Sequence, residues 1–226
     1  MWREVSAAFA ACAQEYEAWY QGNPLFEAEL AALKALGPVP KPSLEIGVGP
    51  GVFAEALGFS HGLDPSLEML RRARKRGIKV VAGVGEDLPF KEGSFAACGL
   101  FFTLCFVEDP LRVLAEARRV LKREGLLYLG VVPADSPWGE FYQAKKRAGH
   151  RLYRLANFLT REKVLALVQG LGLKLERAFS SLFQSPLGPP SFEAPQEGIR
   201  EGAGFLALLF KSSPPLPGNG GDTPAG

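Results

Sequence analysis

Apolar residues in the first forty positions recur at the spacing of helices. The segment from Trp2 to Gly22 has helical composition and ends at the break Gly22-Asn23-Pro24. A second helix is predicted over 24–36, because its apolar residues fall on one face, namely Leu25, Ala28, Leu33 and Leu36. The prolines at 38, 40 and 42 end this part of the chain. We therefore predict an N-terminal helical cap over residues 1–37.

From Ser43 onward the pattern changes to short apolar runs that alternate with helices, which is typical of a parallel sheet. The predicted strands are 43–49, 61–64, 78–83, 94–104 and 125–132, with helices between them at 50–57, 66–76 and 110–122. The run 94–104 is apolar at successive positions, as expected of a central strand that is buried on both faces. Residues 43–132 are thus the predicted core.

The regular alternation stops after residue 132. A helical stretch rich in basic and aromatic residues predicts an inserted lid over 134–158. Thr160 then caps another helix, with Lys163 at the position where a full capping box has an acid or amide. Two apolar runs, 173–183 and 203–210, predict a pair of antiparallel strands at the sheet edge.

These elements predict one α/β domain over residues 1–211. Its sheet would be Rossmann-like, with seven mostly parallel strands and an antiparallel final strand in a three-layer α/β/α arrangement, to which the N-terminal helices and the lid are added. Residues 160–211 supply the C-terminal helix and the strand pair. The segment 212–226 is rich in proline and glycine, and we expect it to be disordered.

Composition narrows the classes of function. The chain has 226 residues with 26 basic and 24 acidic side chains, so its net charge of +2 gives no reason to expect nucleic-acid binding. Three scattered cysteines and two histidines favour neither a disulfide framework nor a metal site. The N-terminus does not resemble a signal peptide, and no run reaches the roughly 18 apolar residues that span a bilayer. We therefore expect a cytoplasmic protein without membrane insertion, whose oligomeric state the sequence does not indicate.

The first predicted core strand runs directly into a turn with glycines at 47, 49 and 51. Glycines let the backbone approach a ligand closely, and the N–H groups that start the following helix attract an anionic group. A dinucleotide-binding turn would have its third glycine at the position of Val52. Glu45 is unfavourable beside a pyrophosphate but suits an ammonium group, so the turn fits the zwitterionic end of a methionine moiety. A tight strand-to-helix turn that binds no ligand is the alternative.

Asp64 ends the second predicted core strand, 17 residues after Gly47 (64 − 47). In nucleotide-binding sheets an acid at this place accepts hydrogen bonds from ribose hydroxyls. Alternatively, Asp64 caps the helix that starts near Ser66, although Ser66 could cap it alone.

Three motifs follow one another along the core: Glu45-x-Gly47-x-Gly49-x-Gly51, Gly62-x-Asp64-Pro65-Ser66 and Gly83-Val84-Gly85-Glu86-Asp87-Leu88-Pro89-Phe90. Together they resemble the successive motifs of class I S-adenosylmethionine-dependent methyltransferases, and most of all the ubiquinone-biosynthesis-like branch that acts on small molecules. Ser94-Phe95, Asp109-Pro110 and the run 112–122 are similar to the parts of that family that follow. The resemblance is close over 43–132 and looser as far as Lys211.

The resemblance implies S-adenosyl-L-methionine as cofactor, S-adenosyl-L-homocysteine as product and a small-molecule methyl acceptor as partner. It makes residues 43–132 a cofactor-binding core. The methionine end of the cofactor would be held by Glu45, Gly47, Gly49 and Gly51, above the strand end with Phe102, Thr103 and Leu104. The adenosine would be held by Asp64 at the ribose, by Pro65 at the adenine face and by Gly85 and Glu86 at the adenine edge.

Tyr16 begins a segment, Tyr16–Tyr20, that resembles one found in many of these enzymes, where it folds over the cofactor. Tyr16 is therefore assigned to the cofactor site, with an aromatic stripe that merely buries the helix as the alternative. Two positions depart from the family pattern. Val84 stands where many relatives have an aspartate that meets the adenine amino group. Cys105-Phe106 stands where many have one or two histidines, so a histidine function is absent there.

The resemblance implies methyl transfer by in-line displacement, in which the protein aligns the acceptor and excludes water. No catalytic residue is assigned, and Tyr16, Glu108 and His150 are the candidates if the acceptor must lose a proton. The basic stretch around His150 is either a solvated face or part of the pocket, and the second case would favour an anionic acceptor. A non-catalytic S-adenosylmethionine-binding regulatory protein and a nicotinamide-dependent oxidoreductase are the alternatives, and Val52 counts against the oxidoreductase.

Overall fold

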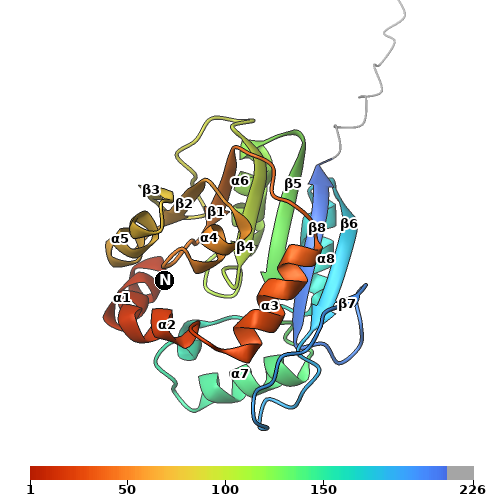
Figure 1. The fold of residues 1–226 in the computed structure, drawn as a ribbon. Coiled ribbons are helices and arrows are strands. Elements are labelled where there is room, and N and C mark those ends of the chain that lie inside the picture. The colour runs from red at the N-terminus through yellow and green to blue at the C-terminus, as the bar shows by residue number, and fades with distance from the viewer. Residues whose placement is uncertain (213–226) are drawn as a thin grey trace, which may run out of the picture.

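An eight-stranded sheet runs through the computed structural model, which describes residues 1–212 (Figure 1). The strands are ordered β3-β2-β1-β4-β5-β8-β6-β7. Their bounds are β1 Ser43–Ile46, β2 His61–Asp64, β3 Lys79–Ala82, β4 Phe95–Phe101, β5 Leu121–Val131, β6 Leu173–Ser181, β7 Gln196–Glu197 and β8 Phe205–Ser212. Strands β1 to β5 pair in parallel, whereas β8 is antiparallel to both of its neighbours.

This arrangement confirms the predicted Rossmann-like sheet, which is mostly parallel and has an antiparallel final strand. Two details differ from the prediction. The two-residue strand β7 is additional, and β8 lies between β5 and β6 rather than at the edge. The inner place of β8 explains why all but one of its residues are buried. The segment predicted to be disordered is 212–226. Its first residue, Ser212, is the last residue of β8, and residues 213–226 lie outside the described part of the chain.

Helices cover both faces of the sheet and form the outer two of three layers (Figure 1). The helices are α1 Trp2–Ala11, α2 Ala13–Trp19, α3 Pro24–Ala35, α4 Val52–Leu57, α5 Leu67–Lys75, α6 Pro110–Val120, α7 Pro137–Arg147 and α8 Arg161–Gly170, with a 3₁₀ turn at Tyr153–Leu155. Helices α6 and α8 pack on one face through residues such as Val113 and Val164, and α3, α4 and α5 pack on the other. None of the helices within residues 1–212 has an apolar stretch of the length that spans a bilayer.

The first segment, predicted as one helix, is broken at Cys12, whose φ of −121° and ψ of 19° are not helical. The sequence has no glycine or proline there to signal the break. Beyond it, the ring of Tyr20 packs against Phe26 at 5.0 Å between centroids, which anchors α2 on α3. Glu17 of α2 also forms ion pairs with Arg72 and Arg76 at 2.6 and 2.7 Å. Tertiary contacts of α2 therefore bend a segment that local sequence alone would continue.

The segment predicted as a lid contains α7 and the 3₁₀ turn. Ser136 caps α7 by accepting a hydrogen bond from the Gly139 N–H at 3.0 Å. The indole of Trp138 is buried and donates to the Gln184 carbonyl at 3.0 Å. Thr160 caps α8 through the Lys163 N–H, as predicted. These contacts fix the base of the lid segment to the loop that follows β6.

Candidate active site

The carboxyl ends of β1, β2 and β4 meet at one cavity, next to the turn between β1 and α4. All three glycines of this turn have positive φ, +73° at Gly47, +52° at Gly49 and +81° at Gly51. A side chain is strained in this region of backbone space, whereas glycine is not. The Gly47 N–H donates to the Leu63 carbonyl at 2.8 Å and ties the turn to β2.

The three glycines do different things. A Cβ on Gly51 would lie 2.9 Å from the backbone of Ala73, so this glycine allows α4 to pack closely on α5. A Cβ on Gly47 would lie 2.6 Å from Thr103. Gly49 has open space in front of it, and both Gly47 and Gly49 line the cavity, whereas Gly51 does not.

Asp64 connects the glycine turn with the start of α5. Its carboxylate accepts one hydrogen bond from the Gly49 N–H at 3.0 Å and one from the Ser66 N–H at 2.8 Å. Ser66 itself caps α5 by accepting from the Met69 N–H. Since an ionised carboxylate has about four acceptor positions, Asp64 retains two for a ligand in the cavity.

This strand-end cavity, of about 110 Å³, brings together most of the residues predicted for the cofactor. Nine of them line it: Tyr16, Gly47, Gly49, Asp64, Pro65, Gly85, Glu86, Phe102 and Thr103. Glu45, Gly51 and Leu104 do not, and Leu104 is part of the hydrophobic core instead. Val84 lines the cavity too, so at this position an apolar side chain faces the space where many relatives have an aspartate.

Glu45 lies just behind the turn and is 1% exposed. Among residues 1–212 its Oε2 has no hydrogen-bond partner. Burial, and after it the nearby Asp64 carboxylate, raises the pKa of Glu45 well above its usual value. The open glycine turn and the free acceptor positions of Asp64 fit a ligand with ribose hydroxyls. The partnerless oxygen of Glu45 lies behind the turn and not on the cavity surface, and from there its negative charge would favour an ammonium group on the ligand.

The sequence predicted an N-terminal helical cap, but no residue of α1 was assigned to this cavity. Four residues of α1 line it: Trp2, Val5, Ser6 and Phe9. Their spacing of three, one and three positions places them on one face of a helix, and that pattern was the available signal. Glu86 is held at the far side, where its carboxylate accepts from the Glu108 N–H at 2.9 Å.

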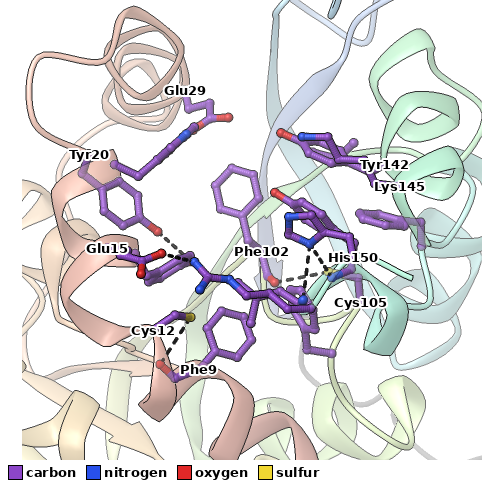
Figure 2. A pocket seen from close by; sticks show the side chains of 18 residues that line it. Phe9, Cys12, Glu15, Tyr20, Glu29, Phe102, Cys105, Tyr142, Lys145 and His150 are labelled. Carbon is purple, nitrogen blue, oxygen red and sulfur yellow. Dashed lines mark hydrogen bonds and ion pairs between the residues drawn. The ribbon is translucent and has the colours of Figure 1, made fainter. Parts of the chain in front are cut away.

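A second cavity, the lid cavity, of about 350 Å³, adjoins the first. The two share the side chains of Phe9, Tyr16, Phe102 and Phe106. In Figure 2, Phe9, Cys12, Glu15, Tyr20 and Glu29 of the N-terminal helices form one wall and Tyr142, Lys145 and His150 of the lid form the other. Its volume is in the range of sites that bind small molecules.

Phe102 stands at the junction of the two cavities. It has a φ of +57°, although it is not glycine, and it stacks on Phe205 with 5.2 Å between ring centroids. Its N–H donates to the Gly130 carbonyl at 2.9 Å, and its carbonyl accepts from the Cys105 thiol at 3.3 Å. Backbone strain of this kind persists only where surrounding contacts enforce it, and it is concentrated at functional sites.

The three candidate bases have different surroundings. Tyr16 lines both cavities, its hydroxyl accepts from the Tyr20 hydroxyl at 2.7 Å, and burial raises the pKa of its phenol. Glu108 is 63% exposed, lines neither cavity and pairs with the N-terminal ammonium at 3.4 Å. His150 lines the lid cavity, and burial lowers the pKa of its imidazole. Tyr16 and His150 therefore reach the lid cavity, and Glu108 does not.

Part of the basic stretch around His150 lines the lid cavity. Arg151 forms an ion pair with Glu15, and Lys145 lies over the ring of Phe141 at 4.5 Å. Arg154 points elsewhere and pairs with Glu4 at 2.8 Å. The ion pairs of Arg151 and Arg154 both connect the segment 134–158 to the N-terminal helices, so these two parts of the chain are linked beside the cavity.

Comparisons with known proteins agree with this geometry. A family model described as a methyltransferase domain matches residues 44–129. A demethylmenaquinone methyltransferase of Thermotoga maritima is 30% identical over 176 residues, which are 66% of this chain and 76% of that protein. An uncharacterized protein of Mycobacterium tuberculosis is 41% identical over 209 residues, 90% of this chain and 73% of that protein.

A solved structure gives the same result. The crystal structure of an S-adenosylmethionine-dependent methyltransferase from Thermotoga maritima, described as a possible histamine N-methyltransferase, superimposes with a TM-score of 0.85 at 35% identity. The match covers 92% of this chain and 100% of that one. With the fold, the glycine turn and the relatives in agreement, the chain belongs to the class I S-adenosylmethionine-dependent methyltransferases.

Proposed function

We propose that this methyltransferase binds S-adenosylmethionine in the strand-end cavity and methylates a small molecule in the lid cavity. The observation that carries the proposal is the contact between the two cavities, which share Phe9, Tyr16, Phe102 and Phe106. A methyl group presented at this junction would face an acceptor in the lid cavity. The lid cavity is walled by side chains and has the volume of a small-molecule site rather than of an open macromolecular surface.

The bound cofactor supplies a methyl group on a positively charged sulfur, which an acceptor lone pair takes as the carbon–sulfur bond breaks and its electron pair returns to sulfur. The residues of this chain bind and orient. In the proposal, Gly47 and Gly49 approach the methionine end, Glu45 lies behind it, and Asp64 accepts from the ribose hydroxyls. The aromatic side chains at the junction exclude water, and such alignment can provide most of the rate enhancement.

The activities ascribed to two relatives suggest two kinds of acceptor. The solved Thermotoga relative is described as a possible histamine N-methyltransferase, which points to an amine. The other Thermotoga relative is a demethylmenaquinone methyltransferase, which points to a quinone ring. Both belong in the first set of acceptors to be tested.

Two measurements on the full chain test the proposal. S-Adenosylhomocysteine at a hundredfold excess over its Kd should stabilise the protein by about 2.7 kcal/mol, and NAD should not. With cofactor labelled in the methyl group, the label should appear in the small-molecule fraction of a metabolite extract. Stabilisation by NAD alone would contradict the proposal, and tight cofactor binding without any transfer would favour a regulatory protein.

The affinity for S-adenosylhomocysteine should fall as the pH drops below about 6. Burial raises the pKa of the Asp64 carboxyl to about 6, and the Ser66 and Gly49 N–H groups offset only part of this. Ribose hydroxyls donate to the ionised form, so affinity should decrease by up to about tenfold per pH unit below that pKa. Titrations between about pH 5 and pH 8 measure this decrease.

The folding stability of the ligand-free protein should change with pH in the opposite direction and should increase as the pH falls. A carboxyl whose folded pKa is raised takes up a proton on folding between its folded and unfolded pKa values, so the cost of burying the Asp64 charge begins to decrease as the pH falls below about 6 and is gone below about 3.9. Glu45 and Glu86 are the other carboxyls beside the cavity. Asp64→Asn should remove the pH dependence of binding, and an unchanged dependence in this variant would assign it to one of those two residues instead.

A further inference from the structure

Glu29 is a buried carboxylate on the wall of the lid cavity that the proposed function does not yet use. It lies on the apolar face of α3, next to Ala28 and below Leu33, and is 3% exposed. Among residues 1–212 its Oε2 has no hydrogen-bond partner. The side chain lines the lid cavity opposite Tyr142 and Lys145 (Figure 2). Burial raises the pKa of Glu29 well above its usual value, and a cation bound in the cavity would favour the ionised form. Buried polar atoms are normally paired, so the partnerless Oε2 on the cavity wall indicates a ligand.

Glu29 shares the lid cavity with four tyrosines. Its charge, after burial, contributes to the raised pKa of four phenols, which belong to Tyr16, Tyr20, Tyr142 and Tyr153. Tyr16 and Tyr20 come from α2 and its end, and Tyr142 and Tyr153 from α7 and the 3₁₀ turn, so both walls of the cavity carry aromatic residues. A carboxyl group in an aromatic-lined cavity is favourable for an organic cation, because aromatic rings attract positive charge and a carboxylate neutralises it.

The cationic side chains of the cavity do not neutralise Glu29. Arg151 pairs with Glu15, and Lys145 lies over the rings of Phe141 and Tyr153 at 4.5 and 5.8 Å. The Nδ1 of His150 accepts from two backbone N–H groups at 3.3 and 3.4 Å. Neither Lys145 nor Arg151 forms an ion pair with Glu29 within the described residues. The presence of basic residues in the pocket therefore does not by itself select an anionic acceptor.

We infer that the methyl acceptor carries a basic amino group, and that Glu29 binds this group as an ammonium ion in the lid cavity. The ammonium group anchors the acceptor, and the methyl group goes to a different atom of the same molecule that has a free lone pair. The inference rests on the proposed function and makes it more specific. It favours the amine over the quinone as acceptor, because a quinone ring carries no positive charge that could pair with Glu29. Glu29 acts here in binding the acceptor and is not assigned to the transfer step.

A series of three probes tests the inference directly. Phenylethylamine, phenylethanol and phenylacetate have the same ring and differ in the charge of the head group. Their Kd values are measured by calorimetry with the full chain saturated with S-adenosylhomocysteine. The amine should bind at least about tenfold more tightly than the alcohol, as expected for a hydrogen-bonded charge. Phenylacetate should bind most weakly.

Glu29→Gln keeps the shape of the side chain and removes its charge. In this variant the preference for the amine over the alcohol should fall below about threefold, while the affinity for S-adenosylhomocysteine stays unchanged. Glu27→Gln is the matched control, because Glu27 is on the same helix but exposed, and it lines neither cavity. This control should retain the full preference for the amine.

The inference is overturned if the three probes bind alike, if phenylacetate binds best, if none binds up to its solubility limit, or if Glu29→Gln keeps the preference. These results leave the proposed function standing, since it depends on cofactor binding and label transfer. If the label is transferred only to uncharged or anionic molecules, the inference of an amine acceptor is refuted, whereas the proposed methyltransferase function still holds. Absence of all transfer would remove the proposed function itself.

Discussion

Asp64→Ala should weaken the binding of S-adenosylhomocysteine by roughly 1–3 kcal/mol, because ribose hydroxyls that lose their charged acceptor remain unpaired in a largely enclosed site. The carboxylate lies at the end of β2 and is positioned by the Gly49 and Ser66 N–H groups at 3.0 and 2.8 Å. Titration calorimetry of the wild-type and variant proteins measures the difference. A cofactor analogue without the ribose 2′-hydroxyl should lose less affinity on the same substitution.

The Asp64→Ala experiment needs a control, because the substitution also removes a link between the glycine turn and α5. Ser66→Ala removes the helix cap and should cost about 1 kcal/mol of folding stability. Ser66 does not line the strand-end cavity, so its loss should leave cofactor affinity unchanged. The role of Asp64 is structural only if Asp64→Ala and Ser66→Ala weaken cofactor binding equally. The same conclusion follows if Asp64→Ala weakens the binding of the analogue as much as that of S-adenosylhomocysteine.

The strand-end cavity was largely predictable from the sequence because its determinants are local. Gly47 and Gly49 follow directly on a strand, and Asp64 ends the next one, so the order of elements alone brings them to one edge of a parallel sheet. Gly51 shows the limit of such reasoning. The motif assigns it to the cofactor, whereas its close approach to Ala73 shows a packing role that depends on where α5 lies.

The lid cavity could not be predicted in the same way, since its walls come from segments far apart in the sequence. Glu29 and Tyr153, for example, line the same cavity, although strands β1 to β5 lie between them in the sequence. One signal was present: Glu29 interrupts the apolar face of a helix that the spacing of Leu25, Ala28 and Leu33 predicts. An acidic residue at such a position is either paired within the fold or binds a ligand, and only the packed structure shows that the Glu29 Oε2 has no partner among residues 1–212.

Gly47→Ala should lower both stability and cofactor binding, with a cost of about 2–4 kcal/mol to folding. The estimate combines about 1 kcal/mol for a side chain at a φ of +73° with about 1–3 kcal/mol for overpacking against Thr103. The Thr103 hydroxyl donates to the Ile46 carbonyl at 3.1 Å, so displacing it also disturbs the end of β1. Denaturant unfolding measures the first effect and calorimetry with S-adenosylhomocysteine the second, which should exceed about a hundredfold.

Gly58→Ala separates backbone strain from steric conflict. Gly58 has a φ of +80°, similar to that of Gly47, but a Cβ there would have nothing within 4 Å. This variant should cost only about 1 kcal/mol of stability and leave cofactor affinity intact, because strain is its sole effect. Adding Thr103→Ala to Gly47→Ala should restore part of the lost stability by making room for the new methyl group. Equal losses of stability and cofactor affinity in the Gly47 and Gly58 variants would contradict this prediction. They would show that the close approach of Gly47 to Thr103 has no effect, and that the glycine is needed only for its backbone conformation.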